Sequence, residues 1–243
     1  MRFKFKIQPY QAEAARAVTD VFAGQPNIGA SLYLRDLGRT VGSDGTEVLP
    51  GFETQVQASE GFANTPIALG SATLLSNLNK VQRRNRVMES TGLATGPAPV
   101  NLDIEMETGT GKTYVYTKTM LDLNRLYGWT KFIVVVPSIA IREGVYKSLK
   151  NTEQHFFEQY GKAIRYFVYN SARLGDIDRF SASSDINVMV INMQAFNTSM
   201  KEGGRSKEAR IMYSERDEFA SRRPIDVIAA NNPIVILDEP QKM

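Results

Sequence analysis

The residues with the clearest chemical pattern lie in the segment LDIEMETGTGKT, which spans residues 102 to 113. Its glycines are small enough for successive backbone N–H groups to face an anion, and a lysine and a threonine follow them directly. In a loop of this kind the lysine contacts the outer phosphates of a nucleotide and the hydroxyl binds a magnesium ion. The pattern therefore predicts a phosphate site formed by Thr108, Gly109, Thr110, Gly111, Lys112 and Thr113. The longer form of the motif begins with glycine where this chain has Met106, so the match is to the shorter TGxGKT form.

A second chemical pattern is a pair of carboxylates, Asp238 and Glu239, directly after the apolar run Ile234 to Leu237. The run predicts a buried strand, which places both carboxylates at a strand end. In phosphate-loop enzymes the first such carboxylate holds magnesium, usually through water, and an adjacent one orients or deprotonates the attacking water. An acidic pair can also be a solvated turn, but the phosphate loop upstream favours the catalytic interpretation.

Gln11 is a candidate for recognition of the nucleotide base. A glutamine amide carries one acceptor and two donors, so it can pair with the adenine edge, which offers both a donor and an acceptor. The same residue can also be an ordinary solvent-facing glutamine at a helix start, and this pattern taken alone favours that second interpretation.

The apolar spacing predicts the elements that must position these residues. Residues 7 to 26 have helical spacing that ends at Gly24 and Pro26, and residues 100 to 106 alternate as a strand. A helix over residues 114 to 126 and a buried strand over 131 to 136 complete a strand–helix–strand unit. Further apolar runs at 163 to 169, 186 to 191 and 233 to 237 predict a mostly parallel, doubly wound α/β sheet. The glycine turn then precedes a helix N-terminus, whose dipole favours an anion.

Residues 27 to 99 are predicted to form an inserted segment, because short apolar runs alternate there with glycine and proline turns. Strands are expected at 31 to 34 and 53 to 56, and a helix around Leu74 to Val81. The basic end of that helix suits either a nucleic-acid backbone or the helix C-terminal dipole. A solvated helix end is the favoured interpretation, because such charge clusters are common on protein surfaces. The polar stretch from 200 to 217 is expected to be a flexible surface loop.

Composition excludes several classes of protein. With 243 residues and 42% hydrophobic content, the chain can bury a sizeable core. It has no apolar run of the roughly 18 residues that a membrane helix needs, and the start lacks a signal-peptide core, so we expect a cytoplasmic protein without membrane contact. Cysteine is absent and His155, expected on a helix surface, is the one histidine, which excludes disulfides and a zinc centre. A net charge of +3 permits binding to a polyanion without proving it.

Four segments together resemble the superfamily 2 helicase-type ATPases: METGTGKT at 106 to 113, VVVPSIAIREGV at 134 to 145, VINMQAF at 190 to 196 and ILDEPQ at 236 to 241. The combination of DEPQ with METGTGKT is most similar to the restriction (Res) subunit of type III restriction-modification enzymes. The resemblance covers the whole chain and implies a RecA-like P-loop domain with an insertion before the phosphate loop.

The resemblance also implies a role for each matching residue, with ATP and Mg²⁺ as the ligands. Gln11 would read adenine, Lys112 would bind the β- and γ-phosphates, and Glu239 would activate water. Thr113 and Asp238 would bind magnesium, and Gln241 would link the state of the ATP to the grip on DNA. Contacts to the nucleic-acid backbone are implied for Pro137, Ser138, Arg142, Asn192 and Gln194. For Ser138 and Arg142, a helix N-cap and a solvated arginine are equally good interpretations.

The implied partners are double-stranded DNA and the methyltransferase (Mod) subunit. The expected organisation is one N-terminal ATPase domain, with residues 1–26 as the adenine-reading helix, 27–99 as the insertion and 100–243 as the core. Motors of this type close ATP between two RecA-like domains. We therefore expect this chain to be a fragment without the second motor domain and the nuclease domain, with weak ATP binding and slow hydrolysis.

Two other functions remain open from the sequence. The first is a general DNA or RNA helicase domain of the same superfamily. The second is a nucleotide-binding interaction module that docks a partner without hydrolysing ATP.

Overall fold

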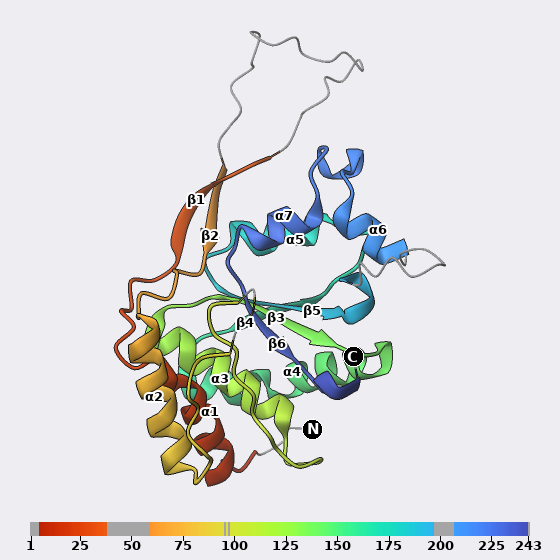
Figure 1. Ribbon diagram of the computed structural model, residues 1–243. Coiled ribbons are helices and arrows are strands. Elements are labelled where there is room, and N and C mark those ends of the chain that lie inside the picture. Colours follow the sequence, from red (N-terminus) through yellow and green to blue (C-terminus); the bar gives the residue numbers. More distant parts are fainter. Residues whose placement is uncertain (1–4, 38–58, 95, 97, 197–206, 243) are drawn as a thin grey trace, which may run out of the picture. The chain divides into compact units, whose positions relative to one another are not determined.

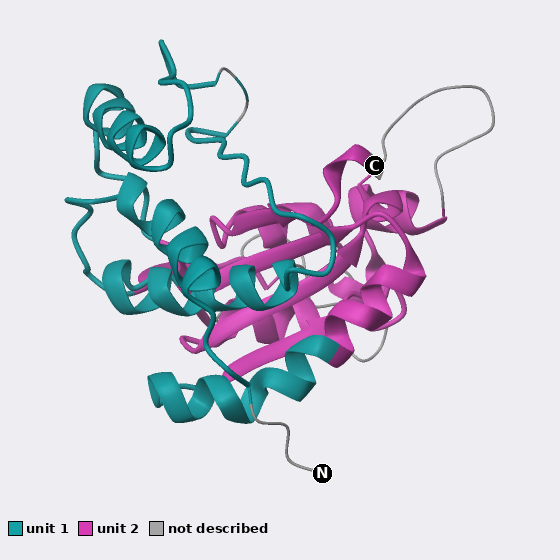
Figure 2. Cartoon of the chain, turned by 90° about the horizontal axis from the view of Figure 1, so that it is seen from below, with its two compact units in different colours: residues 1–29, 65–129, 148–163 teal, residues 30–64, 130–147, 164–243 magenta. Residues whose placement is uncertain are grey.

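The computed structural model describes residues 5–37, 59–94, 96, 98–196 and 207–242 (Figure 1). The chain forms two compact units, each made of three separate stretches of the sequence (Figure 2). Unit 1 comprises Met1–Gly29, Thr65–Trp129 and Ser148–Ala163, and unit 2 comprises Ala30–Asn64, Thr130–Lys147 and Ile164–Met243. Residues 27 to 99 contribute to both units. Among the helices of the described ranges, none has the length and apolar character needed to cross a membrane.

Unit 1 is helical. Its elements are α1 (Pro9–Val21), α2 (Ser71–Arg84), α3 (Lys112–Tyr127) and the part of α4 (Ile139–Tyr160) from Ser148 onward. Pro9 occupies the first turn of α1, where a missing N–H costs no helix hydrogen bond. An aromatic cluster of Phe22, Tyr127 and Trp129 joins the end of α1 to the end of α3, and the Tyr127 hydroxyl donates to the Thr19 carbonyl at 2.8 Å. The three helices predicted here are confirmed.

Residues 100 to 107 form no strand, contrary to expectation. Ile104 is 44% exposed, and Leu102 and Met106 are only half-buried. Alternating apolar residues form a strand only where a neighbouring strand supplies the ladder of hydrogen bonds. Within the described residues this segment has no such neighbour, so it reaches the glycine turn as irregular chain.

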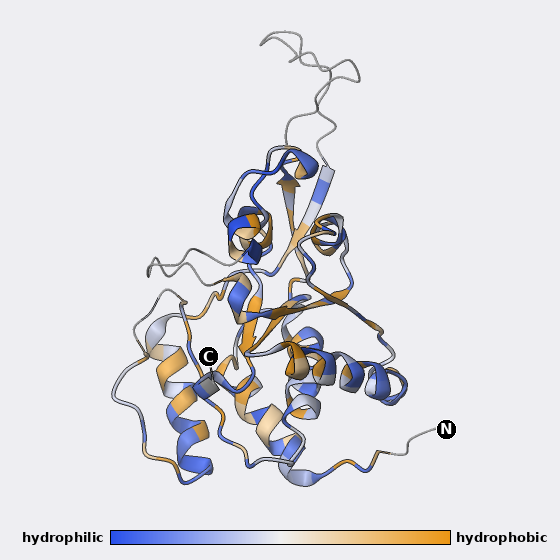
Figure 3. Ribbon diagram, turned by 90° about the vertical axis from the view of Figure 1, so that its right-hand side faces the viewer, coloured by the Kyte–Doolittle hydropathy of each residue, from blue (hydrophilic) through white to orange (hydrophobic). Residues whose placement is uncertain are grey.

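Unit 2 is built on a four-stranded parallel sheet, which confirms the predicted α/β fold. The strand order is β4-β5-β3-β6, with β3 (Lys131–Val136), β4 (Ile164–Val168), β5 (Ile186–Asn192) and β6 (Ile234–Leu237). The two central strands, β3 and β5, are buried at every residue, as expected for strands covered on both faces. Figure 3 shows their hydrophobic composition. Helices α5 (Gly175–Ala182) and α7 (Pro224–Ala229) lie on one face of this sheet (Figure 1).

The strand before the acidic pair is not buried, which corrects a second expectation. β6 lies at the edge of the sheet and pairs with β3 alone, from Phe132↔Ile234 to Val135↔Leu237. Val235 and Leu237 are each 53% exposed. An apolar run of four residues fits either a central or an edge strand, so the sequence could not decide its burial.

The segment expected to be a loop at 200 to 217 contains α6 (Lys207–Tyr213), while residues 200 to 206 lie outside the described residues. Ala209 and Met212 are completely buried. Met212 belongs to a hydrophobic cluster that also includes Met189 and Ile191 of β5 and Phe180 of α5. The short apolar stretch IMY, residues 211 to 213, packs α6 against this cluster. The polar residues around it made the whole segment look like a loop.

Unit 2 also carries an antiparallel hairpin of β1 (Ser31–Arg35) and β2 (Ser59–Ala63), paired from Ser31↔Ala63 to Arg35↔Ser59. The first strand was predicted, whereas the strand predicted at 53 to 56 falls outside the described residues.

In unit 1, two arginines at the basic end of α2 form ion pairs within the protein. Arg83 pairs with Glu89 at 2.8 Å and Arg84 pairs with Asp20 at 2.6 Å, which favours a structural role for both arginines.

Candidate functional site

The glycine turn of unit 1 has the backbone of a phosphate loop. Gly109 and Gly111 have φ of +82° and +86°. These values lie in the left-handed region of the backbone, which residues with a Cβ rarely adopt. Gly111 is the N-cap of α3, and the first helical hydrogen bond runs from the Val115 N–H to the Gly111 carbonyl at 3.0 Å. The N–H groups of the first turn therefore point out of the helix N-terminus, where anions are stabilised. Lys112 and Thr113 occupy this turn.

Helix α1 contacts the loop directly. The Gln11 side chain, 9% exposed, donates from Nε2 to the Thr110 carbonyl at 2.9 Å, and the Tyr10 hydroxyl donates to the same carbonyl at 3.1 Å. Gln11 is therefore not a freely solvated residue. The contact between Tyr10 and Thr110 could not be predicted from local spacing, because the two residues are 100 positions apart.

The first turn of α3 is also anchored on α4. The Tyr114 hydroxyl lies 2.9 Å from Nε2 of His155, whose ring stacks obliquely against Phe5 and Tyr114. Burial lowers the pKa of His155, which favours the neutral ring. His155 was expected on the surface but is half-buried, since its helix packs this face against the residue that follows the phosphate loop.

In unit 2, the acidic pair lies at the carboxyl edge of the parallel sheet. The Asp238 N–H donates to the Val135 carbonyl at 2.9 Å and continues the β3–β6 pairing by one residue. Asp238 is 9% exposed. Glu239 has φ of +58°, a strained value for a residue with a side chain, and accepts a hydrogen bond of 2.5 Å from Nε2 of Gln241. Gln241 belongs to a short 3₁₀ helix, η3 (Pro240–Lys242).

The residues expected to touch nucleic acid gather at the same edge of this sheet. Pro137 follows β3, and Asn192, at the end of β5, pairs in register with Val136. Gln194, in the 3₁₀ helix η1 (Met193–Ala195), donates to the Pro137 carbonyl at 3.3 Å. The Asn192 side-chain oxygen is buried and has no hydrogen-bond partner. The parallel register thus brings the ends of β3, β5 and β6 together.

Ser138 and Arg142 begin α4. The Ser138 hydroxyl accepts a hydrogen bond from the Ile141 N–H at 3.3 Å. Ser138 therefore caps the N-terminus of α4, which agrees with the helix-cap interpretation of this residue. Arg142 is not fully solvated: its side chain is 20% exposed, touches Glu143 at 3.3 Å and has a buried, unpartnered Nε.

Arg142 lines a cavity of about 470 Å³ that no motif predicted. Tyr146, Tyr166, Tyr169 and Arg173 form other parts of its wall. The Tyr169 hydroxyl is buried without a hydrogen-bond partner, and burial together with the charge of Glu208 raises its pKa to about 12. This cavity adjoins the strand ends where the predicted DNA contacts lie.

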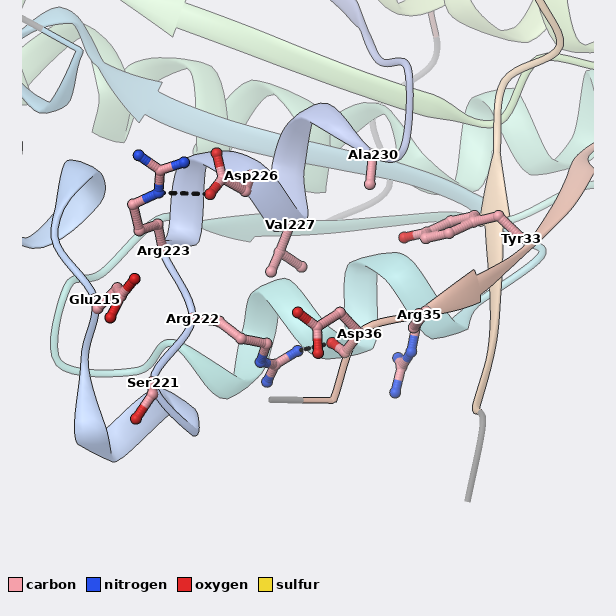
Figure 4. Close-up of a pocket in the computed structure, with 10 residues that line it drawn as sticks. All are labelled: Tyr33, Arg35, Asp36, Glu215, Ser221, Arg222, Arg223, Asp226, Val227 and Ala230. Carbon is pink, nitrogen blue, oxygen red and sulfur yellow. Dashed lines mark hydrogen bonds and ion pairs between the residues drawn. The ribbon is translucent and has the colours of Figure 1, made fainter. Parts of the chain in front are cut away.

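A second cavity, of about 240 Å³, lies between the hairpin and α7 and contains none of the predicted site residues (Figure 4). Arg222 in its wall pairs with both carboxylate oxygens of Asp178 at 2.8 and 2.9 Å and stacks on Phe219. Arg223 pairs with Asp226 at 2.6 Å. These ion pairs neutralise two of its arginines within the protein.

The glycine loop of unit 1 has groups that fit a phosphate with its magnesium ion. The hydroxyl of Thr113, in the first turn of α3, is a hard oxygen ligand of the kind that Mg²⁺ prefers. A Cβ on Gly109 would meet no atom within 4 Å, so the space beside this glycine is open.

The parallel sheet and the glycine loop at a helix start define an α/β protein of the phosphate-loop class. The sequence profile of the family described as "Type III restriction enzyme, res subunit" matches residues 4–240. The chain belongs to this family.

Three curated relatives that match this chain are also Res subunits of type III restriction-modification enzymes. The Type III restriction-modification enzyme EcoPI Res subunit of Escherichia phage P1 is 31% identical over 193 residues, covering 74% of this chain and 20% of the relative. The EcoP15I Res subunit of Escherichia coli is 29% identical over the same length and coverage. The StyLTI Res subunit of Salmonella typhimurium is 31% identical over 160 residues, covering 58% and 16%. The chain thus spans about a fifth of the length of the first two relatives.

Proposed function

We propose that this chain is the ATP-binding motor segment of a type III restriction subunit, which hydrolyses ATP to drive movement or switching on double-stranded DNA. The observation that carries the proposal is the phosphate loop, with left-handed glycines at its turn and Gln11 bound to its Thr110 carbonyl. Family membership over residues 4–240, which runs across both units, supports treating the chain as one ATPase domain with an insertion at 27–99.

Each predicted residue has a defined task in this proposal. Lys112 and the N–H groups of the first turn of α3 hold the β- and γ-phosphates, and Gln11 reads adenine. Glu239 accepts a proton from water as the water oxygen bonds to the γ-phosphorus and the bond to the β–γ bridging oxygen breaks, which releases ADP and phosphate. Thr113 and Asp238 would hold Mg²⁺, which neutralises charge on the phosphates when bound.

The nucleic-acid side of the proposal uses the carboxyl edge of the sheet in unit 2. Pro137, Ser138, Arg142, Asn192 and Gln194 contact the DNA backbone. Gln241 links the two activities, and its hydrogen bond to Glu239 supports this role, because a shift of one side chain moves the other. A Mod subunit supplies sequence recognition, and the complex works in the cytoplasm, where the DNA is.

The test is Glu239→Gln, which keeps the size of the side chain and removes its basicity. We expect ATP binding within about twofold of wild type and hydrolysis reduced by about a hundredfold or more, the usual contribution of a general base. Binding is measured by calorimetric titration, and hydrolysis by phosphate release with and without double-stranded DNA and the Mod subunit.

Glu158→Gln is the matched control, because Glu158 is an exposed carboxylate on α4. It should hydrolyse ATP at the wild-type rate. Equal turnover by wild type and Glu239→Gln would reject the hydrolytic role and favour a nucleotide-binding module that works without turnover.

A further inference from the structure

The Thr110 carbonyl, in the middle of the glycine turn, accepts two side-chain hydrogen bonds from one turn of α1. Tyr10 donates its hydroxyl hydrogen at 3.1 Å and Gln11 donates an amide hydrogen at 2.9 Å. On its other side, Thr110 is tied to the Glu107 carbonyl by its hydroxyl at 2.6 Å and by its N–H at 3.4 Å. This residue is therefore held by contacts from both directions.

The orientation of this carbonyl decides where the next N–H points. A peptide unit is planar and trans, so the Thr110 carbonyl and the Gly111 N–H point in opposite directions. Because the carbonyl faces α1, the Gly111 N–H faces away from α1. Rotation of this one peptide changes ψ of Thr110 and φ of Gly111 and would turn the N–H away from the anion. Gly111 would oppose such rotation only weakly, because glycine adopts many values of φ.

We infer that Tyr10 is a positioning residue, whose hydroxyl fixes the Thr110 peptide so that the Gly111 N–H is presented to the phosphates. The inference rests on the proposed function, because it assumes that the loop binds a nucleotide. Tyr10 is 47% exposed, so its contribution comes from this hydrogen bond and not from burial.

Tyr10 and Gln11 then act on different parts of the ligand. A glutamine amide has two N–H donors and one acceptor, so after donating to Thr110 it still offers a donor and an acceptor to adenine. Tyr10 acts only through the peptide that faces the phosphates. Loss of the Tyr10 hydroxyl should weaken every triphosphate equally, whereas loss of Gln11 should weaken ATP more than ligands without adenine.

The experiment is to measure dissociation constants of the chain for ATP, GTP and inorganic tripolyphosphate in wild type, Tyr10→Phe and Gln11→Ala. Tyr10→Phe should weaken all three by about three- to tenfold, the effect of one net hydrogen bond. Gln11→Ala should also remove the preference for ATP over GTP. Tyr213→Phe is the matched control, since it removes another tyrosine hydroxyl that donates to a backbone carbonyl, that of Phe196 at 3.3 Å; it should bind all three ligands like wild type.

A second measurement needs no ligand. Amide hydrogen exchange across residues 109 to 113 should be faster in Tyr10→Phe than in wild type and unchanged in Tyr213→Phe. If wild type binds none of the three ligands, the proposed function fails. If wild type binds them but Tyr10→Phe has the same dissociation constants and exchange rates, or loses affinity for ATP alone, the inference about Tyr10 is overturned while the proposed function stands.

Discussion

Gly111 is the residue at which local backbone geometry and the proposed chemistry meet. Its φ of +86° disfavours any side chain, and a Cβ built there would lie 2.6 Å from Nε2 of Gln11. An alanine would therefore strain the backbone and also displace the amide that holds Thr110. Gly109 has a similar φ but open space around it, so only the first effect applies there.

We expect Gly111→Ala to weaken ATP binding by at least about tenfold, because a left-handed alanine costs roughly 1–2 kcal/mol and the loop can avoid this cost only by changing conformation. Titration calorimetry measures the affinity, and thermal unfolding measures the accompanying loss of stability. Gly144→Ala, in α4 with no atom within 4 Å of the added Cβ, should bind ATP normally and be no less stable. Wild-type affinity in Gly111→Ala would contradict this view of the loop.

At the scale of elements, Lys131 joins the start of β3 to α5. Its side chain is completely buried and donates from Nζ to the carbonyls of Phe180 and Ser183. Burial lowers the pKa of Lys131 from 10.5 to about 8, and the nearby charge of Asp185 opposes the change. The ammonium form is thus less favourable in the folded chain than in the unfolded one.

This shift predicts that the contribution of Lys131 to the stability of wild type becomes more favourable as the pH rises from about 8 to 10.5. In that window the unfolded chain binds more protons at Lys131 than the folded chain, so the free energy of unfolding increases with pH, by up to about 1.4 kcal/mol per pH unit. Below pH 8 both states are protonated and the contribution is flat. Urea unfolding of wild type and Lys131→Met across this range measures the effect as a difference.

Subtracting the variant removes the opposite contribution of buried tyrosines. Burial raises the pKa of Tyr127 and Tyr169, so their ionisation in the unfolded chain lowers stability near pH 10 in both proteins. Lys147→Met, which changes an exposed lysine of α4, should show the wild-type pH dependence. A constant difference between wild type and Lys131→Met would mean that the buried lysine titrates like an unfolded one.

At the scale of the whole molecule, the proposed DNA contact depends on strand ends brought together by the parallel sheet of unit 2. Arg142→Gln should weaken binding to double-stranded DNA by a similar factor for every sequence. The slope of log affinity against log salt should fall by about one, as expected for loss of one phosphate contact. Fluorescence anisotropy at several salt concentrations measures both quantities.

The control is Arg165→Gln, because Arg165 lies near the amino end of β4 and pairs with Asp185 at 2.7 Å. It should keep the wild-type salt slope. Equal slopes for wild type and Arg142→Gln would contradict the proposed DNA contact. They would favour a structural interpretation of this region, in which Ser138 caps α4 and Arg142 stabilises the fold.

The sequence by itself determined the features that depend on neighbouring residues. The TGTGKT turn predicted a glycine loop at a helix start, and the continuous apolar runs of β3 and β5 predicted buried strands. The order of motifs from Gln11 to Gln241 was enough to indicate the family. Such features are local, so composition and spacing carry them.

Only the tertiary structure decided the features that depend on distant residues. Alternation at 100 to 106 predicted a strand, but a strand needs a paired neighbour that the described chain does not supply. The IMY stretch of α6 became core because β5 and α5 offer a surface for it, and β6 became an edge because it pairs on one side alone. The Tyr10 contact to Thr110 and the burial of Lys131 also arise between segments far apart in the chain. Hydrogen-bond ladders and burial are properties of pairs of segments, and local spacing does not encode which segments meet.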